Sequence, residues 1–585
     1  MTRPRTLIRL LVVSLCAAAI FAAPAVAGDA ILKVIPKDAI AFVVVNNIEN
    51  ADQICTELGE AVQAPIPTLS DTLKKKTGID AALNKKGDMA LVFYQGETAP
   101  QGAAPICILL PVKDYKKFLS KFEDAEKVTD AIQKVTIKNI DVLVAQKGDY
   151  AVFAHGSGQE VLEAFLAAKG NVAGEVQPWK PWMNRQAAYV VLTNHGLQKY
   201  LKEGIEMLEG TIESFEQFPS TSPQLEQIKK SLRMYVMAMK AVRDNTKQIG
   251  LGMAKVDQGA IQVSLRCDAK PDSGLAKMTE DSAKLPANPM SVLPDGSYVL
   301  AAGGPISQKA MAVLIQFSQS MNGSQLGLSK EQNEKLTKLS IDAIKPVLGQ
   351  SLMVGTPGPK AETVFDNACG VMWVTNADTY LTAYKKQMGA MDKYLKGQEG
   401  VPMQMSVEET TVDGRKAMVG KVDFSGFLSN PQLAQAGGIL KNFFGEDLKM
   451  TVYNVKVSDN MIVTAMGGKD QLSKLIKVAT TKAGSLAGNE GIKKVNALLP
   501  ADAQAFGYWS PAGTVELANW VIAKLPEELK ENMPFEKLPE FPTCPPVGMA
   551  FKTGSGSLEG TLTLPSDTLS SIAKYLKELQ AMGPH

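Results

Sequence analysis

The sequence predicts an α+β protein made of tandem-duplicated modules, each an antiparallel sheet with helices packed on one face, arranged in two lobes. Short apolar runs rich in β-branched residues recur along the chain, each after a Pro and a polar corner. Helix-like segments follow these runs, and stretches that alternate apolar and polar residues come next. Such recurrence of one order of elements indicates a modular chain. The runs are VIPKDAIAFVVVN at 34–46, PWMNRQAAYVVLTN from Pro181, VLPDGSYVLAAGG from Val292 and LLPADAQAFGYWS from Leu498.

The order of the elements predicts four modules after an N-terminal segment. The run APICILLPVKDYKKFLSKF is matched in the second half by ACGVMWVTNADTYLTAYKKQM, because both join an apolar strand through an acidic corner to a helix with Tyr and paired Lys. A linker near 284–292 separates two lobes, and each lobe holds one long and one short module. The predicted boundaries are 1–27 for the N-terminal segment, 28–177 and 289–484 for the long modules, and 178–288 and 485–585 for the short modules.

Local signals predict several elements inside the long modules. Asn50, Asp114 and Ser307 are the expected helix N-caps. The stretch KVTIKNIDVLVAQ is expected to pair with YAVFAHG across a KGD turn. The second long module carries an insertion, in which Asp413-Gly414 predicts a hairpin with a type I′ turn.

The first 27 residues have the pattern of a secretory signal peptide. Arg3, Arg5 and Arg9 precede an apolar stretch at 10–21, and Ala25-Val26-Ala27 has the small residues of a cleavage site. The apolar stretch is too short for a convincing membrane anchor, and no later stretch reaches the length of a spanning helix. We therefore expect cleavage after Ala27 and a periplasmic or secreted protein without a membrane span.

The charge of the chain is close to balanced. There are 62 Lys and Arg against 60 Asp and Glu, and removal of the three arginines of the signal segment leaves 59 against 60. Because nucleic-acid binding requires a basic surface, this balance argues against a nucleic-acid partner. The hydrophobic content of 45% is that of a globular protein.

The expected mature chain contains an odd number of widely spaced cysteines, which is not the pattern of a disulfide-rich scaffold. Cys107 and Cys369 lie in apolar, strand-like runs, where a buried free thiol is the favoured interpretation. The sequence leaves one disulfide open and does not assign it. The five cysteines are Cys55, Cys107, Cys267, Cys369 and Cys544.

No catalytic, metal-binding or cofactor-binding residue is predicted. The only histidines are His155, His195 and His585, which argues against a zinc site or a catalytic triad. Ser157 lies near His155 in AHGSGQE, but the spacing is wrong for a nucleophile elbow, and the matching turn AMGGKDQ has Met and Gly at those positions. GSGSLEG at 554–560 is interpreted as a hairpin turn, because it lacks the Lys-Ser/Thr ending of a phosphate-binding loop.

The 25 methionines raise the alternative of a copper(I) carrier. Met403 and Met405 would share one face of a strand, but no His or Cys stands near them. Met234, Met237 and Met239 fall in one expected helix. Adaptable core packing or a soft apolar surface is the favoured interpretation of these residues.

Trp179 and Trp182, in VQPWKPWMN, are the one candidate contact for a ligand or partner. The flanking prolines suggest an exposed aromatic pair that could stack on a sugar or a partner segment. The alternative is a buried plug between modules. The recurring acids Asp38, Asp295 and Asp502 are interpreted as turn or capping residues.

Two of the strand openings carry a short resemblance. The openings Ile35-Pro36-Lys37-Asp38-Ala39 and Leu499-Pro500-Ala501-Asp502-Ala503 resemble the L-P-x-D-A motif of uncharacterised exported bacterial proteins with a domain of unknown function. The resemblance covers the module starts only. It implies an exported α+β protein and carries over no functional residues.

These observations favour an exported, non-enzymatic protein that binds a ligand or serves as a structural part of the cell envelope. Its partner could be a protein, a glycan or an apolar molecule. One alternative is an exported hydrolase with a site of Asp, Glu, Ser and Lys between the lobes, which converging polar side chains in one lobe alone would favour. The other is a carrier of an apolar ligand, which an enclosed apolar cavity would favour.

Overall fold

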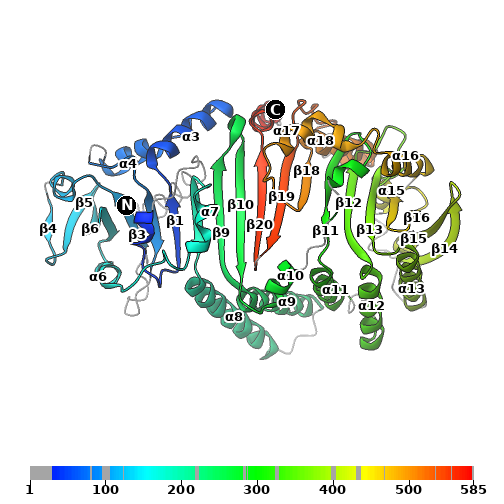
Figure 1. Cartoon of the computed structure of the whole chain (residues 1–585), viewed down its shortest axis with the longest axis horizontal. Helices are drawn as coiled ribbons and strands as arrows, with labels where there is room; N and C mark the ends of the chain where they lie inside the picture. The colour runs from blue at the N-terminus through cyan, green and yellow to red at the C-terminus, as the bar shows by residue number, and fades with distance from the viewer. Residues whose placement is uncertain are drawn as a thin grey trace. The chain divides into compact units, whose positions relative to one another are not determined.

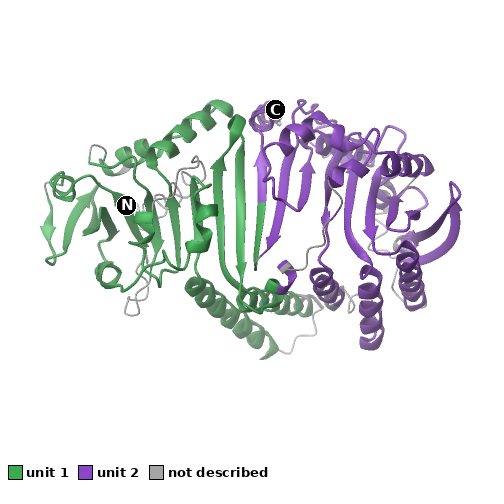
Figure 2. Ribbon diagram, viewed as in Figure 1, with its two compact units in different colours: residues 1–276, 556–560 green, residues 277–555, 561–585 purple. Residues whose placement is uncertain are grey.

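The chain is a mixed helix and strand protein whose strand pairings are antiparallel, as a computed structural model shows (Figure 1). It divides into two compact units: unit 1 contains 1–276 and 556–560, and unit 2 contains 277–555 and 561–585 (Figure 2). None of the described helices has the length and apolar character needed to cross a membrane. The predicted signal segment lies outside the described residues, which are 29–79, 82–94, 106–122, 124–217, 223–280, 285, 288–322, 328–396, 403–429, 437–466, 468–531, 533, 535–554 and 556–582.

In unit 1 the described strands follow the order β10-β9-β8-β1-β2-β3-β7-β6-β5-β4. Strands β8 to β10, which lie in the predicted short module, therefore pair at β1 with the strands of the predicted long module. The elements are α2 (Asp29–Leu32), β1 (Ala41–Val45), α3 (Ile48–Ala61), α4 (Leu69–Thr77), β2 (Met89–Phe93), β3 (Ile106–Pro111), α5 (Tyr115–Leu119), β4 (Glu126–Lys127), β5 (Ile132–Ile137), β6 (Ile140–Lys147), β7 (Tyr150–His155), α6 (Gln159–Ala167), η1 (Gln177–Trp179), α7 (Lys180–Met183), β8 (Ala188–Leu192), α8 (Asn194–Gln217), α9 (Pro223–Asn245), β9 (Thr246–Lys255), η2 (Asp257–Gly259), β10 (Ile261–Ala269) and α10 (Gly274–Glu280).

In unit 2 the described strands follow the order β20-β19-β18-β11-β12-β13-β17-β16-β15-β14. This order corresponds strand for strand to that of unit 1. The elements are η3 (Pro289–Val292), β11 (Tyr298–Pro305), α11 (Gln308–Asn322), α12 (Lys330–Ile344), β12 (Val347–Gly355), β13 (Ala368–Val374), α13 (Ala377–Leu395), β14 (Gln404–Val412), β15 (Arg415–Asp423), η4 (Ser425–Ser429), α15 (Gly437–Phe444), β16 (Lys449–Ser458), β17 (Met461–Met466), α16 (Lys469–Thr481), η5 (Leu486–Gly488), α17 (Glu490–Asn496), β18 (Ala505–Trp509), α18 (Pro511–Lys524), α19 (Glu527–Lys530), β19 (Val547–Gly554), β20 (Ser557–Leu564) and α20 (Ser566–Ala581).

The prediction that helices cover one face of each sheet is wrong for both units. In β1, Phe42 and Val44 join a core with α2, α6 and α7, whereas Val43 and Val45 join a core with α3, α4 and α5. In unit 2, Trp373 of β13 packs in the core that includes α16, and its neighbour Val374 packs with α13. An uninterrupted apolar strand is typical of a sheet that is covered on both sides, and AFVVV is such a strand.

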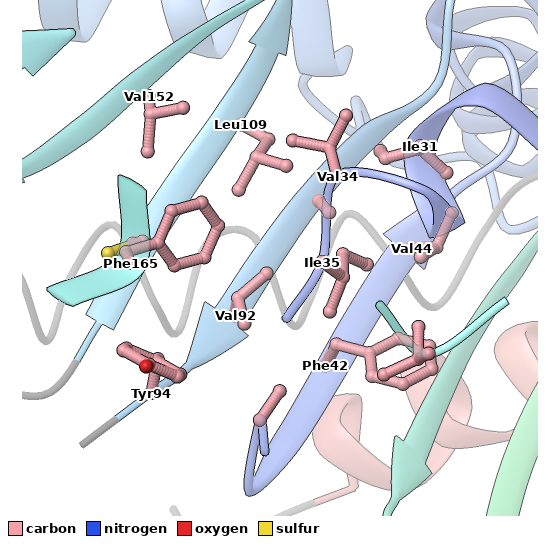
Figure 3. Close-up of a cluster of buried hydrophobic side chains, with 14 of the residues drawn as sticks. Ile31, Val34, Ile35, Phe42, Val44, Val92, Tyr94, Leu109, Val152 and Phe165 are labelled. Atoms are coloured by element: carbon pink, nitrogen blue, oxygen red, sulfur yellow. The ribbon is translucent and has the colours of Figure 1, made fainter. Parts of the chain in front are cut away.

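The core on the α2 and α6 side of unit 1 is shown in Figure 3. Phe42 of β1, Val92 of β2, Leu109 of β3 and Val152 of β7 project from neighbouring strands toward the same layer. Phe165 of α6 closes this layer and meets the ring of Tyr94 edge-on, with 5.6 Å between centroids. The recurring opening strand is thus the centre of a two-sided core.

The helix caps agree with the sequence at two of three positions. Asp114 accepts a hydrogen bond from the Lys117 amide at the start of α5, and Ser307 accepts one from the Ala310 amide at the start of α11. Asn50 is not a cap. Helix α3 begins three residues earlier because Asn47, at a φ of 57°, accepts from the Asn50 amide.

Two hairpins differ in how well their turns were predicted. Asp413 and Gly414 have positive φ values of 49° and 72° between β14 and β15, which confirms the type I′ turn. The stretch KVTIKNIDVLVAQ is not one strand: it forms β5 and β6 around Lys138-Asn139, with φ values of 48° and 63°. Two non-glycine residues with positive φ carry a weaker sequence signal than Asp-Gly does.

Both units contain a close approach between a helix and the first long-module strand. The Gly196 amide donates to the Thr193 hydroxyl at the start of α8, and the Gly513 amide donates to the Ser510 hydroxyl at the start of α18. A Cβ atom on Gly196 would lie 2.0 Å from the Ile40 carbonyl oxygen. Gly513 is equally constrained, because its Cβ would lie 1.9 Å from the carbonyl oxygen of Tyr298. Only glycine fits at either position.

Candidate functional site

Unit 2 contains a hollow of about 980 Å³ at one end of strands β14, β15 and β16. Its lining comes from these strand ends, from the C-terminal end of α13, from the connection between β15 and β16, and from loop and helix residues nearby. The lining residues are Glu362, Thr363, Asp392, Lys396, Gln404, Met405, Ser406, Lys421, Val422, Asp423, Lys441, Phe444, Gly445, Glu446, Asp447, Lys449, Thr451 and Lys524. We refer to this hollow as the charged cleft.

The strand register places polar side chains in two rows across the cleft. Asp423 of β15 pairs with Gln404 of β14 and with Lys449 of β16. Two residues away, Lys421 pairs with Ser406 and with Thr451 in the same way. Because side chains alternate along a strand, these six residues share one face of the sheet. Met405 and Val422 project from the other face, so the hollow extends around the strand ends.

In the connection between β15 and β16, the described segment 437–448 forms a wall of the cleft. Phe424 stacks on Phe444 with 4.3 Å between ring centroids, and Phe444 also contacts Phe365 at 5.9 Å. The Phe424 amide donates to the Leu448 carbonyl at 2.8 Å, which closes the connection back onto the sheet. The prediction that the insertion includes the Asp413-Gly414 hairpin is wrong, because β14 and β15 correspond to β4 and β5 of unit 1. The segment without a counterpart is the connection after β15, and an aromatic cluster anchors it beside the charged rows.

A turn before β13 supports the same wall. The carboxylate of Asp366 accepts hydrogen bonds from the amides of Glu362 and Thr363, and also from the Thr363 hydroxyl. The Val364 amide donates to the carbonyl of Phe443, which is next to the stacked Phe444. The side chain of Asp366 thus fixes the position of the lining residues Glu362 and Thr363.

Charges of both signs line the cleft in equal number. Lys441 forms an ion pair with Glu446 at 3.0 Å, and Lys421 forms one with Glu408 at 2.5 Å. Hydrogen bonds from Ser425, together with the positive charge of Lys449, lower the pKa of the Asp423 carboxyl, which is therefore ionised at neutral pH and is not a proton donor. The lining charges are Lys396, Lys421, Lys441, Lys449 and Lys524 against Glu362, Asp392, Asp423, Glu446 and Asp447.

The corresponding place in unit 1 is a different kind of hollow. A space of about 620 Å³ lies between the end of α5 and the end of β5, with Phe118 and Phe122 in its lining. Its charged lining residues are Lys121, Asp124 and Lys138. The tight turn between β5 and β6 takes the place of the long connection in unit 2. Among the described residues, this place in unit 1 is therefore lined by three charged side chains, whereas the charged cleft of unit 2 is lined by ten.

Trp179 and Trp182 are not an exposed pair. Both indole rings are completely buried, 5.4 Å apart between centroids, so the interpretation as a ligand contact is wrong and the buried plug is what the structure shows. They pack under β9, where a Cβ on Gly250 would lie 2.4 Å from the Trp179 ring. The indole N–H of Trp179 donates to Asp268 of β10 at 2.6 Å, which supplies the polar partner that a buried Trp requires.

His155 and Ser157 meet only within a local turn. The His155 Nδ1 atom lies 2.8 Å from the Ser157 hydroxyl and accepts from the Ser157 backbone amide at 3.2 Å. This geometry belongs to a turn in which the two residues are neighbours, and it positions no third catalytic group. GSGSLEG connects β19 and β20 as a hairpin, as predicted.

All five cysteines of the described chain are free thiols. Cys107 of β3 and Cys369 of β13 are buried, as expected, and burial raises the pKa of each thiol to about 12. Cys55 is also buried, and its pKa is raised to about 11. Cys107 and Cys369 are the second residues of corresponding strands.

The remaining candidates from the sequence are metal-binding groups and the methionines. Among the described residues, no group of three or more His, Cys, Asp and Glu side chains could hold a metal ion. Met239 packs with Ile205 and Val236 in the hairpin of α8 and α9, whereas Met237 is exposed. Met405 lies in β14, two residues after Met403, and lines the charged cleft.

The three recurring acids take different partners. Asp38 accepts from the hydroxyl of Tyr94 at 3.1 Å, Asp295 accepts from the side chain of Asn489 at 3.3 Å, and Asp502 pairs with Lys552. Each acid tethers the corner before a strand to another element. None of them lines the charged cleft.

Of the residues that line the charged cleft, sequence reasoning singled out Met405 alone, and only for the copper(I) alternative. The available signal was the predicted insertion in the second half of the chain, because a segment without a counterpart in unit 1 is free to take a function that the fold does not need. The chain matches no known protein family, and no curated protein and no solved structure is detectably similar to it. A function for this chain is therefore inferred from the geometry of the charged cleft.

Proposed function

We propose that this chain is an exported, non-enzymatic binding protein, and that the charged cleft of unit 2 holds a peptide-like ligand with both positive and negative groups. The observation that carries the proposal is the equal set of lysines and carboxylates around one hollow of about 980 Å³. A ligand of one sign would meet repulsion from half of these groups, whereas a mixed-charge ligand can pair with both.

The size of the cleft and its walls support binding of an extended segment. A hollow of about 980 Å³ is at the upper end of the range for small-ligand sites. The backbone of β14 to β16 is fixed by antiparallel pairing, so the charged rows are held on rigid strands. A rigid site with charges in fixed positions favours specificity over tight, unselective binding.

The proposal is tested by calorimetric titration of the mature chain with hexapeptides. The alternating Lys-Glu hexapeptide should bind at least about tenfold more tightly than hexalysine or hexaglutamate, a difference of about 1.4 kcal/mol. Lys449→Gln should weaken binding of the alternating peptide by about five- to tenfold, since it removes one charge-assisted contact.

Lys330→Gln is the matched control. Lys330 also lies in unit 2, but its side chain is 92% exposed at the start of α12 and away from the cleft lining. Equal binding of the three hexapeptides, or equal effects of the two Lys→Gln variants, would refute the proposal.

Export and duplication are further parts of this proposal. The signal pattern at 1–27 supports export, and N-terminal sequencing of the protein from a periplasmic or culture fraction should begin at Gly28. An intact Met1 in that fraction would contradict cleavage.

The corresponding strand orders support the inference that an ancestral long-plus-short module pair was duplicated in tandem.

A further inference from the structure

A second hollow, of about 640 Å³, lies in unit 1 at the start of α8. Four lysines reach it from three separate segments: the corner before β1, the loop after α6 and the first three turns of α8. Two acids and one histidine complete its ionisable lining. These residues are Lys37, Lys169, Lys199, Lys202, His195, Asp38 and Glu175. We refer to this hollow as the lysine pocket.

The acids of the lysine pocket do not balance its lysines. Glu175 lies 3.8 Å from Lys37, and Asp38 is already the acceptor of the Tyr94 hydroxyl at 3.1 Å. Lys202 contacts the exposed Glu206, which lies outside the pocket lining, at 3.9 Å. The positive end of the α8 dipole adds to the same potential. The lining therefore carries a surplus of positive charge around a space large enough for a small anion.

The corresponding positions of unit 2 do not reproduce this surplus. Because Gly196 and Gly513 occupy matching places, Lys199 corresponds to Glu516 three residues later. In the same alignment Lys202 corresponds to Asn519. Glu516 accepts a hydrogen bond from Ser297 at 2.5 Å, so unit 2 has an acid in a structural contact at this point. Lys199 and Lys202 are thus not required by the architecture that the two units share.

We propose that the lysine pocket binds the phosphate groups of an anionic ligand. Ammonium groups that converge from three segments can surround a phosphate, and each acts as a point charge with donors that rotate to meet its oxygens. The site is separate from the charged cleft and differs in the ligand it takes, so it extends the proposed function of the chain.

Titration of the mature chain with inorganic pyrophosphate, at constant ionic strength, tests the pocket. Pyrophosphate should bind saturably, and the double variant Lys169→Glu/Lys202→Glu should bind it at least tenfold more weakly. Both side chains are exposed, so the double variant leaves the hydrophobic core intact. The control is Lys116→Glu/Lys117→Glu, which makes the same charge change on the exposed side of α5 in the same unit.

A second arm identifies the source of the phosphate. Cosedimentation with phosphatidylglycerol vesicles, lost in the double variant but not in the control, would assign the pocket to a lipid headgroup; pyrophosphate binding without cosedimentation would assign it to a soluble phosphate. No saturable binding in either arm, or equal losses in the two double variants, overturns the proposal. Retained binding of the alternating hexapeptide by Lys169→Glu/Lys202→Glu keeps this test independent of the charged cleft.

Discussion

In unit 1, strands β5 and β6 are joined by the turn Lys138-Asn139, whereas in unit 2 the corresponding strands β15 and β16 are joined by the segment 424–448. The strand orders of the two units correspond throughout, so this connection adds nothing to the sheet. It adds a wall, an aromatic anchor and several charges beside the strand ends. The comparison teaches that the shared sheet is a scaffold and that ligand sites are expected where the two units differ.

The buried tryptophans are a second difference, and their removal should have the largest effect. Unit 1 places Trp179 and Trp182 under Gly250 of β9, whereas unit 2 places Val495 under Gly548 of β19. Trp182→Ala should lower the free energy of unfolding of unit 1 by about 3–5 kcal/mol, because it leaves a large cavity in a dense core.

Urea unfolding followed by alkylation of Cys107 in unit 1 and Cys369 in unit 2 measures each unit separately. Trp509, which is 37% exposed, is the control, and Trp509→Ala should cost less than about 1 kcal/mol. Equal losses in the free energy of unfolding from the two substitutions would contradict the burial of Trp182.

The matching glycines test what the units share. Gly196→Ala and Gly513→Ala should each destabilise their own unit by about 2–3 kcal/mol, because the added methyl group meets a backbone carbonyl that cannot move without shifting a strand. Gly196→Ala should expose Cys107 to alkylation at lower urea, and Gly513→Ala should do so for Cys369.

Gly210→Ala in α8 and Gly389→Ala in α13 are the controls, since a Cβ at either site meets no atom within 4 Å. Both should raise stability by about 0.5–1 kcal/mol through helix propensity. A smaller loss at Gly196 or Gly513 than about 1 kcal/mol would show that the close approach is not tight in solution.

The aromatic anchor tests the connection that distinguishes the units. Phe444→Ala removes the stack with Phe424 and should weaken the alternating hexapeptide by about fivefold, because the wall of the cleft loses its fixed position. Phe122→Ala, in the corresponding hollow of unit 1, should leave peptide affinity unchanged in the same titration. If Phe444→Ala and the parent chain bound the peptide with equal affinity, the connection between β15 and β16 would not contribute to the site.

The smallest effect is expected from the pH dependence of Asp423. Its pKa is lowered in the folded chain, so its stabilising contribution is complete above the ordinary carboxyl pKa near 4 and is lost as the pH falls through the lower, folded value. Asp423→Asn should reduce stability by about 0.5 kcal/mol at pH 7, and the difference should vanish near pH 2. A stability difference between the two chains that grows as the pH falls would contradict a lowered pKa of Asp423.

Much of the framework could be predicted from local sequence. The apolar run at 41–45, the Asp413-Gly414 turn and the cap at Asp114 are signals within a few residues of the structure they specify. The start of α3 was not predicted because Asn47 and Asn50 are both good N-cap residues. The choice between them depends on a distant contact: Asn47 adopts a positive φ, and its amide donates a hydrogen bond to the carboxylate of Asp88. The prolines around Trp179 and Trp182 suggested exposure, but Gly250, far along the chain, makes the space in which both rings are buried.

The sequence by itself determined the repeated order of strands and helices, the balanced charge and the scarcity of histidine, because these depend on composition and short-range pattern. Tertiary structure alone decided that helices cover both faces of each sheet and that the charges of β14 to β16 meet the segment 437–448. It also decided that four lysines from three segments surround one hollow. Both hollows depend on residues brought together by strand register and helix placement over long sequence separations. No local pattern encodes such separations, and so no local pattern could reveal the sites.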